Sequence, residues 1–201
     1  MRSELNIIRR DLSEYRKPIL ILMGAMLALP LIFRQSLDFA KGAVAGLMIG
    51  ASYGFAQMCF ITERQRRTLD LLLSLPIRPF HLVLAKYGSV FSMSLLLVNV
   101  PGVFLLSVTS IYIANAAAIF CAAVCTTPSV LSDKPWAPQV PVWIAIGLLP
   151  LLPLVRRWWP ESILVLRSMA SHPLIISTAL LAISGVMVLV AALLFERKSI
   201  Q

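Results

Sequence analysis

The feature that most constrains this chain is an apolar stretch of 45 residues that runs from Tyr87 to Leu131. As one α-helix it would be about 68 Å long, whereas the hydrocarbon core of a bilayer is roughly 30 Å thick. The stretch must therefore fold back on itself, and Pro101 and residues 107–110 are candidate interruptions. We expect two membrane spans here, at Tyr87–Leu106 and Thr109–Val130.

Apolar runs of membrane-spanning length recur along the rest of the chain. The sequence is 59% hydrophobic and only 13% charged, whereas a soluble domain has roughly 25% charged residues. No soluble domain of useful size fits between the runs. The sequence therefore predicts one all-α, polytopic membrane domain over residues 1–201 with six transmembrane helices. The four other predicted spans are Pro18–Phe33, Gly42–Ile61, Val140–Val155 and Pro173–Phe195.

Two segments have a pattern of their own. In residues 1–17, Leu5, Ile8, Leu12 and Tyr15 recur at helical spacing among basic residues, which predicts an amphipathic helix in the headgroup plane. Contact with lipid is its plainer role, and contact with a protein partner is the alternative. Pro18 would end this helix or open the next. In the second span, glycines recur at every fourth position from residue 42 to residue 54, which indicates close helix packing inside the bundle.

The basic residues predict the orientation in the membrane. With a cytoplasmic N-terminus, 13 of the 18 lysines and arginines fall on the cytoplasmic side. This bias favours cytoplasmic termini, with residues 196–201 as a cytoplasmic tail of a multi-pass protein of the cell (plasma or inner) membrane. Arg156 and Arg157 run against the rule. The net charge of +9 fits contact with anionic lipids better than binding of nucleic acid.

Several kinds of chemistry are missing from the sequence. It contains no Gly-x-x-x-x-Gly-Lys-Ser/Thr phosphate loop, so the chain itself does not bind ATP in that manner. The acidic residues fall in loops or at span ends, which disfavours an ion-coupled transporter. Two isolated histidines and three cysteines in apolar runs supply no catalytic cluster or metal site. We therefore expect no enzyme, no cofactor and no metal in this chain. Any transport would draw its energy from another subunit.

A basic segment, Thr62–Lys86, interrupts the apolar runs. Its sequence, TERQRRTLDLLLSLPIRPFHLVLAK, resembles the cytoplasmic loop of the ABC-2 type transporter permeases. The matching positions are Glu63, Arg64, Thr68, Leu69, Ser74, Leu75, Pro76 and Lys86. Arg67 stands where that family usually has glycine, and Asp70 stands where it usually has glutamate. The specific part of the likeness is this segment, although the number of spans and the N-terminal helix are also similar.

The resemblance implies a half-size permease that pairs with a second permease copy or a homologous chain. It implies two cytoplasmic ATPase subunits as partners, which hold ATP and magnesium, and export of a hydrophobic or amphipathic substrate. Residues 62–86 would then form a cytoplasmic coupling segment with a short coupling helix. The residues that would contact the ATPase subunit are Glu63, Arg64, Arg67, Thr68, Leu69, Asp70, Ser74, Pro76 and Arg78.

Two other functions stay open from the sequence. One is a haem-exporter-like permease of cytochrome assembly, whose loop is similar. The other is a membrane scaffold or assembly protein without a transport cycle, which predicts a chain that is stable without an ATPase and a loop that tolerates substitution.

Overall fold

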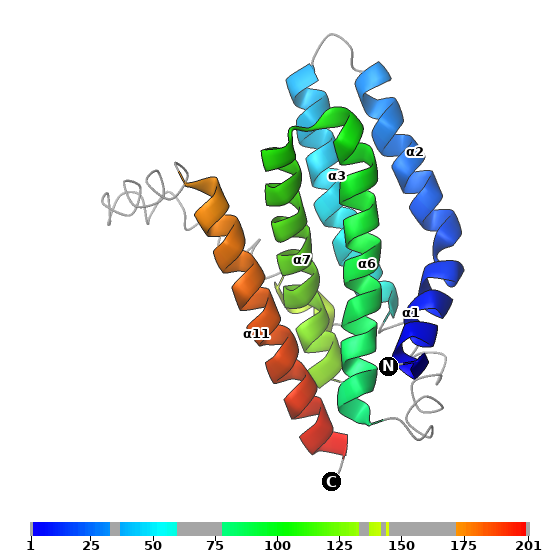
Figure 1. The fold of residues 1–201 in the computed structure, drawn as a ribbon, viewed down its shortest axis with the longest axis vertical. Coiled ribbons are helices and arrows are strands. Elements are labelled where there is room, and N and C mark those ends of the chain that lie inside the picture. The colour runs from blue at the N-terminus through cyan, green and yellow to red at the C-terminus, as the bar shows by residue number, and fades with distance from the viewer. Residues whose placement is uncertain are drawn as a thin grey trace.

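The computed structural model describes residues 2–32, 37–59, 78–132, 137–141, 144 and 172–199. This part of the chain is all-α, as the sequence predicts (Figure 1). Its elements are α1 (Arg2–Glu14), α2 (Arg16–Ile32), α3 (Leu37–Gln57), α6 (Pro79–Leu105), α7 (Val108–Leu131), the short 3₁₀ helix η2 (Ala137–Gln139) and α11 (Pro173–Ser199).

Three of these helices, α6, α7 and α11, are long and apolar enough to cross a membrane. A fourth span is formed if α1 and α2, which meet at a bend of 61°, are counted together. The apolar part of α3, Gly42–Phe55, is shorter. The described residues therefore contain three candidate spans, or four with the bent pair, whereas six are predicted for the whole chain. The predicted span Val140–Val155 lies almost wholly outside the described residues.

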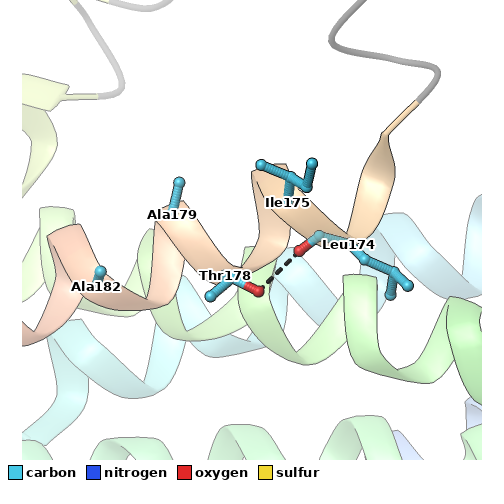
Figure 2. Close-up of a pocket in the computed structure, with 5 residues that line it drawn as sticks. All are labelled: Leu174, Ile175, Thr178, Ala179 and Ala182. Atoms are coloured by element: carbon cyan, nitrogen blue, oxygen red, sulfur yellow. Dashed lines mark hydrogen bonds between the residues drawn. The ribbon is translucent and has the colours of Figure 1, made fainter.

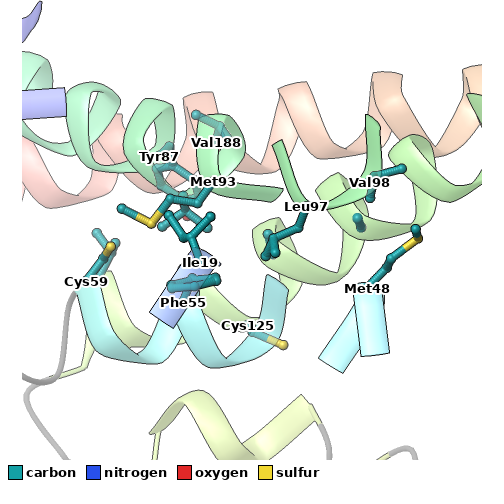
Figure 3. Close-up of a cluster of buried hydrophobic side chains, with 14 of the residues drawn as sticks. Ile19, Met48, Phe55, Cys59, Tyr87, Met93, Leu97, Val98, Cys125 and Val188 are labelled. Atoms are coloured by element: carbon teal, nitrogen blue, oxygen red, sulfur yellow. The ribbon is translucent and has the colours of Figure 1, made fainter. Parts of the chain in front are cut away.

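The helices form a bundle in which α7 lies between α11 on one side and α3 and α6 on the other (Figure 1). α2 packs on α3 and α6 at the outer edge. The core includes Met48 and Phe55 of α3, Tyr87 and Leu97 of α6, and small alanines of α7 (Figure 3). Because alanine is small, the helix axes can approach closely along α7.

The break in the long apolar stretch falls at Leu106 and Ser107, whereas Pro101 lies inside α6. The amide of Leu106 donates to the carbonyl of Gly102 (2.8 Å) and so closes the end of α6. The Ser107 side chain accepts a hydrogen bond from the Ser110 amide (3.3 Å) and caps the start of α7. A serine at this position lets two long helices follow each other without a loop.

The sequence predicts that the glycines of α3 pack inside the bundle, but the structure shows that they do not. Gly42, Gly46 and Gly50 are exposed, and a Cβ atom added at any of them would meet nothing within 4 Å. The opposite face of α3, with Val44, Met48, Ser52 and Phe55, is the buried one. Larger side chains gain more from burial than glycine does, so they determine which face points inward.

Candidate functional site

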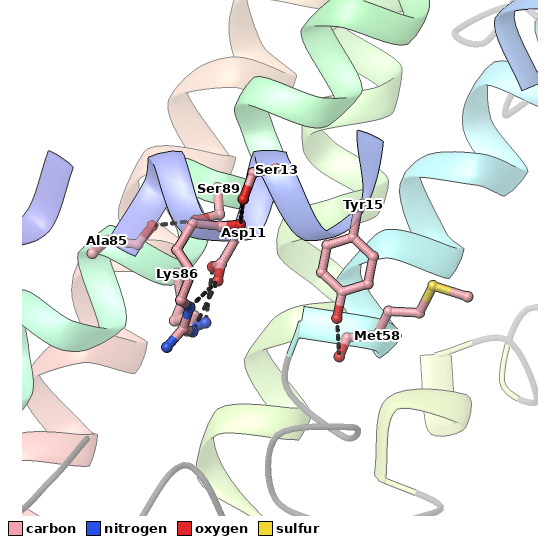
Figure 4. A network of polar contacts seen from close by, with 8 residues as sticks. Asp11, Ser13, Tyr15, Met58, Ala85, Lys86 and Ser89 are labelled. Atoms are coloured by element: carbon pink, nitrogen blue, oxygen red, sulfur yellow. Dashed lines mark hydrogen bonds and ion pairs between the residues drawn. The ribbon is translucent and has the colours of Figure 1, made fainter. Parts of the chain in front are cut away.

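A buried ion pair joins α1 to α6. Asp11 and Lys86 have side chains that are only 1% exposed, and Lys86 Nζ donates to Asp11 Oδ2 at 2.8 Å (Figure 4). The other carboxylate oxygen, Oδ1, accepts from Arg10 Nη2 at 2.9 Å. One carboxylate therefore balances two cations, one of them buried and one at the surface.

The face of α1 that packs on α6 carries Ile7, Ile8 and Asp11. Ile7 forms a small buried cluster with Leu82 and Ala85 of α6. One turn further along α6, a Cβ atom at Gly88 would lie 3.1 Å from Ile8 Cδ1. Glycine at this position thus allows the close approach that brings the Asp11 carboxylate to Lys86.

A lysine and an aspartate out of water are costly unless they are paired with good geometry. The pair lies near the end of α6, since Lys86 is about 10 Å along the helix from Pro79. Helix α1 covers it from the side, and Ser89 on the next turn of α6 bonds to the carbonyl of Ala85 within its own helix. The charges are therefore enclosed by α1 and α6 at one end of the bundle.

Tyr15 makes a second connection, at the bend between α1 and α2. Its ring meets Phe55 of α3 edge-to-face, with centroids 6.1 Å apart. Its hydroxyl donates to the carbonyl of Met58 at 3.3 Å (Figure 4). The C-terminal end of α1 is thereby held against the end of α3.

One connection lies just before the basic segment in the sequence and the other at the last residue of the segment. Met58 comes shortly before Thr62, and Lys86 is the last residue of the segment. Helix α1 therefore contacts the chain both where it leaves α3 and where it continues in α6.

Of the predicted ATPase contacts, only Arg78 lies within the described residues. It is exposed, has an extended backbone (φ −60°, ψ 135°) and precedes Pro79 at the start of α6. Lys86, which also matches the loop motif, is buried in the ion pair with Asp11. The remaining predicted contacts, Glu63, Arg64, Arg67, Thr68, Leu69, Asp70, Ser74 and Pro76, lie outside the described residues.

The exposed basic side chains of the described helices lie on α1, at the start of α2, just before α6 and near the end of α11; apart from the start of α2, these segments lie toward the end of the bundle with both termini (Figure 1). These side chains are Arg9, Arg10, Arg16, Lys17, Arg78 and Arg197. Among the side chains that are described at the opposite end, none is a lysine or arginine.

Polar pairs also link the helices between the two ends. Asn99 of α6 and Asn115 of α7 exchange amide hydrogen bonds of 2.9 and 3.4 Å. Tyr112 of α7 bonds to Thr178 of α11 at 3.0 Å. Such pairs fix helix positions in an apolar environment, where side-chain polar groups have few other partners.

An open hollow lies along α11 (Figure 2). The described residues that line it, Leu174, Ile175, Thr178, Ala179 and Ala182, all belong to this helix. The Thr178 hydroxyl donates to the carbonyl of Leu174 at 2.8 Å and is also paired with Tyr112. The hollow therefore offers an apolar surface and no reactive group.

Among the described residues, no group of three or more histidine, cysteine or acidic side chains could hold a metal ion. The three cysteines form no disulfide: Cys59, which follows α3, and Cys125 of α7 are buried, and Cys121 of α7 is half-buried.

Neither a protein-family model, nor a curated protein, nor a solved structure matches this chain. Any assignment of function therefore depends on the residues themselves.

Sequence reasoning missed the partners of α1. Asp11 lies one turn after Ile7 and one turn before Tyr15, so it stands in the middle of the apolar face of a helix. Lys86 stands between apolar residues on both sides in LVLAKYGSV. An acid and a base that each interrupt an apolar pattern are the signal for a buried pair. Asn99 and Asn115 give the same kind of signal for an interhelical amide pair.

Proposed function

We propose that this chain is the membrane subunit of an ATP-driven exporter of the ABC-2 type. Separate cytoplasmic ATPase subunits would bind and hydrolyse ATP, and a second permease copy or a homologous permease would complete the pathway. The observation that supports this proposal most directly is the resemblance of the basic segment, Thr62–Lys86, to the loop of that family. The segment contains the Thr-Leu-Asp and Ser-Leu-Pro elements of this resemblance.

The proposal includes the finer topology. Six spans place both termini on the cytoplasmic side, and the positive-inside rule supports this orientation. The position of most exposed basic side chains toward the end with the termini also supports it, as does the position of Arg78 at that end. The substrate would be hydrophobic or amphipathic, and the chain itself would hold no cofactor.

The mechanism follows from the position of the segment. Closure of the ATPase subunits on ATP would push the segment, and α6 begins within the C-terminal part of the segment, at Pro79. α6 packs on α2, α3, α7 and α11, so a tilt of α6 would reach each of these helices. Such a rigid-body movement is a common way to convert binding into opening of a pathway.

The test is affinity purification of the chain from its native host in mild detergent, with mass spectrometry of the bound proteins. We expect an ATPase with a phosphate loop, at about one copy per permease, the ratio usual for a two-fold symmetric assembly. Leu69→Asp and Pro76→Asp should each remove the ATPase.

Ser107→Asp is the matched control, because it adds the same charge at the opposite end of the bundle and aspartate also caps a helix well. It should leave the ATPase bound. A preparation without any ATPase, even after cross-linking, would contradict the proposal and favour the scaffold function.

A further inference from the structure

Two contacts of α1 lie at the two ends of the helix pair that the basic segment connects. Asp11 binds Lys86 of α6 at 2.8 Å, and Tyr15 binds the carbonyl of Met58 after α3 at 3.3 Å. We name these two contacts the α1 clip. Asp11 lies in α1 and Tyr15 directly follows its last residue, one turn further along, so both contacts come from one short stretch of chain.

We propose that the α1 clip fixes the separation between the end of α3 and the start of α6, with Asp11 and Tyr15 as positioning residues. Helix α1 is suited to this role because it is held rigidly. The amide of Tyr15 bonds to the carbonyl of Asp11 (3.0 Å), and Ile7 is buried against Leu82 and Ala85.

The ion pair is the specific part of the clip. An apolar contact alone permits sliding of one helix along another, whereas a charged pair with only 1% exposure has one favourable register. Arg10 holds the second oxygen of the same carboxylate and so orients it toward Lys86. The register of α1 on α6 is thereby tied to one residue.

The clip also has a consequence that depends on the proposed function. If the basic segment binds an ATPase, its two ends must be correctly spaced for that surface to form. α1 would then move together with the segment, and loss of the clip would weaken ATPase binding without any change in the predicted contact residues.

The first experiment measures spacing and needs no ATPase. Spin labels are placed at Met58→Cys and Arg78→Cys in the full chain in lipid nanodiscs, with Cys59, Cys121 and Cys125 replaced by alanine. We expect Asp11→Asn to widen the distance distribution about twofold by local opening of α1. Tyr15→Phe, which keeps the ring on Phe55, should widen it less.

Two further variants separate positioning from folding. Asp11→Leu with Lys86→Met replaces the ion pair by an apolar one, which proteins often tolerate well. This double variant should restore a narrow distribution. Arg9→Gln, on the exposed side of the same helix, should match the wild type. An unchanged distribution in Asp11→Asn would overturn the proposal.

The second experiment repeats the purification with Asp11→Asn and with the double variant. We expect less ATPase to be purified with the single variant than with the wild type. The double variant should restore ATPase binding. Equal recovery in all three would refute the link to ATPase binding. If the wild type binds no ATPase while the distance distribution still widens, the clip stands and the proposed function fails.

Discussion

Asp11 is a carboxylate in the middle of the apolar face of α1, and its burial is possible only because Lys86 and Arg10 surround it. The same rule applies to half-buried polar residues further along the bundle. Asn99 and Asn115 satisfy each other across α6 and α7. Single residues of this kind contribute little to overall hydrophobic burial, but they select one arrangement of helices among many that are equally apolar.

The amide pair provides a test at this scale. A double-mutant cycle with Asn99→Ala and Asn115→Ala should give a coupling energy of about 0.6 kcal/mol, and at most about 2 kcal/mol. The free energy of unfolding in mixed micelles measures this coupling energy.

Thr126 bonds within α7 to the carbonyl of Ala122. A cycle of Asn99→Ala with Thr126→Val should therefore show no coupling, because sites more than about 10 Å apart are additive. Equal coupling in both cycles would contradict a direct amide contact.

At the scale of helices, the bend of 61° between α1 and α2 separates two roles. α2 runs along the bundle, whereas α1 turns aside and packs across the first turns of α6 (Figure 1). Pro18 lies in the first turn of α2, which is one of the two positions expected for it. The approach of α1 to α6 depends on the missing side chain at Gly88.

Substitutions at two glycines, one against Ile8 and one in open space, test the close contact between α1 and α6. Gly88→Val should destabilise the protein by about 1–3 kcal/mol, because the new side chain overlaps Ile8. The second change Ile8→Val should recover part of the loss, since it removes the overlapping methyl group. Gly46→Ala is the control: it enters open space, and alanine favours helix by up to about 1 kcal/mol. Thermal unfolding in detergent measures all of these variants. A loss of stability at Gly46 as large as at Gly88 would show that α3 is covered by something else.

Prediction from sequence succeeded where a single physical rule dominates. α7 and α11 lie within a few residues of the predicted spans, because long apolar runs in a membrane have only the helix available. α6 begins earlier than predicted, at Pro79. The polar residues His81 and Lys86 make the stretch before Tyr87 look like part of a loop. Asp11 stabilises the buried Lys86 in that helix, and Asp11 is distant from Lys86 in the sequence. The contacts of α1 and the outward glycines of α3 depend on tertiary packing, which the local pattern does not contain.

For the whole molecule, the feature that bears on orientation is the position of the exposed basic side chains of the described helices. Apart from those at the start of α2, they lie toward the end with both termini. A membrane with a negative cytoplasmic surface would orient such a molecule, because each basic residue near that surface contributes about 1 kcal/mol.

Cysteine labelling tests this orientation. Ser107 and Arg78 are exposed at opposite ends of α6. In a background without the three native cysteines, Ser107→Cys should react with a membrane-impermeant maleimide on intact cells. Arg78→Cys should react only after the cells are opened. The reverse pattern would exclude a cytoplasmic position of the basic segment, and reaction of both on intact cells would show that α6 does not cross the membrane.

The ion pair of α1 and α6 also sets an order of events during biosynthesis. Asp11 and Lys86 are 75 residues apart, which takes roughly 4–15 s to translate at about 5–20 residues per second. Throughout that time α2 and α3 are made and inserted while Lys86, the partner of the Asp11 carboxylate, does not yet exist. α1 must therefore wait at the water-facing surface, and it can close over α6 only when the newly made Lys86 arrives. Helix α1 thus leaves the ribosome before α6 but completes its contacts only after α6 has been made.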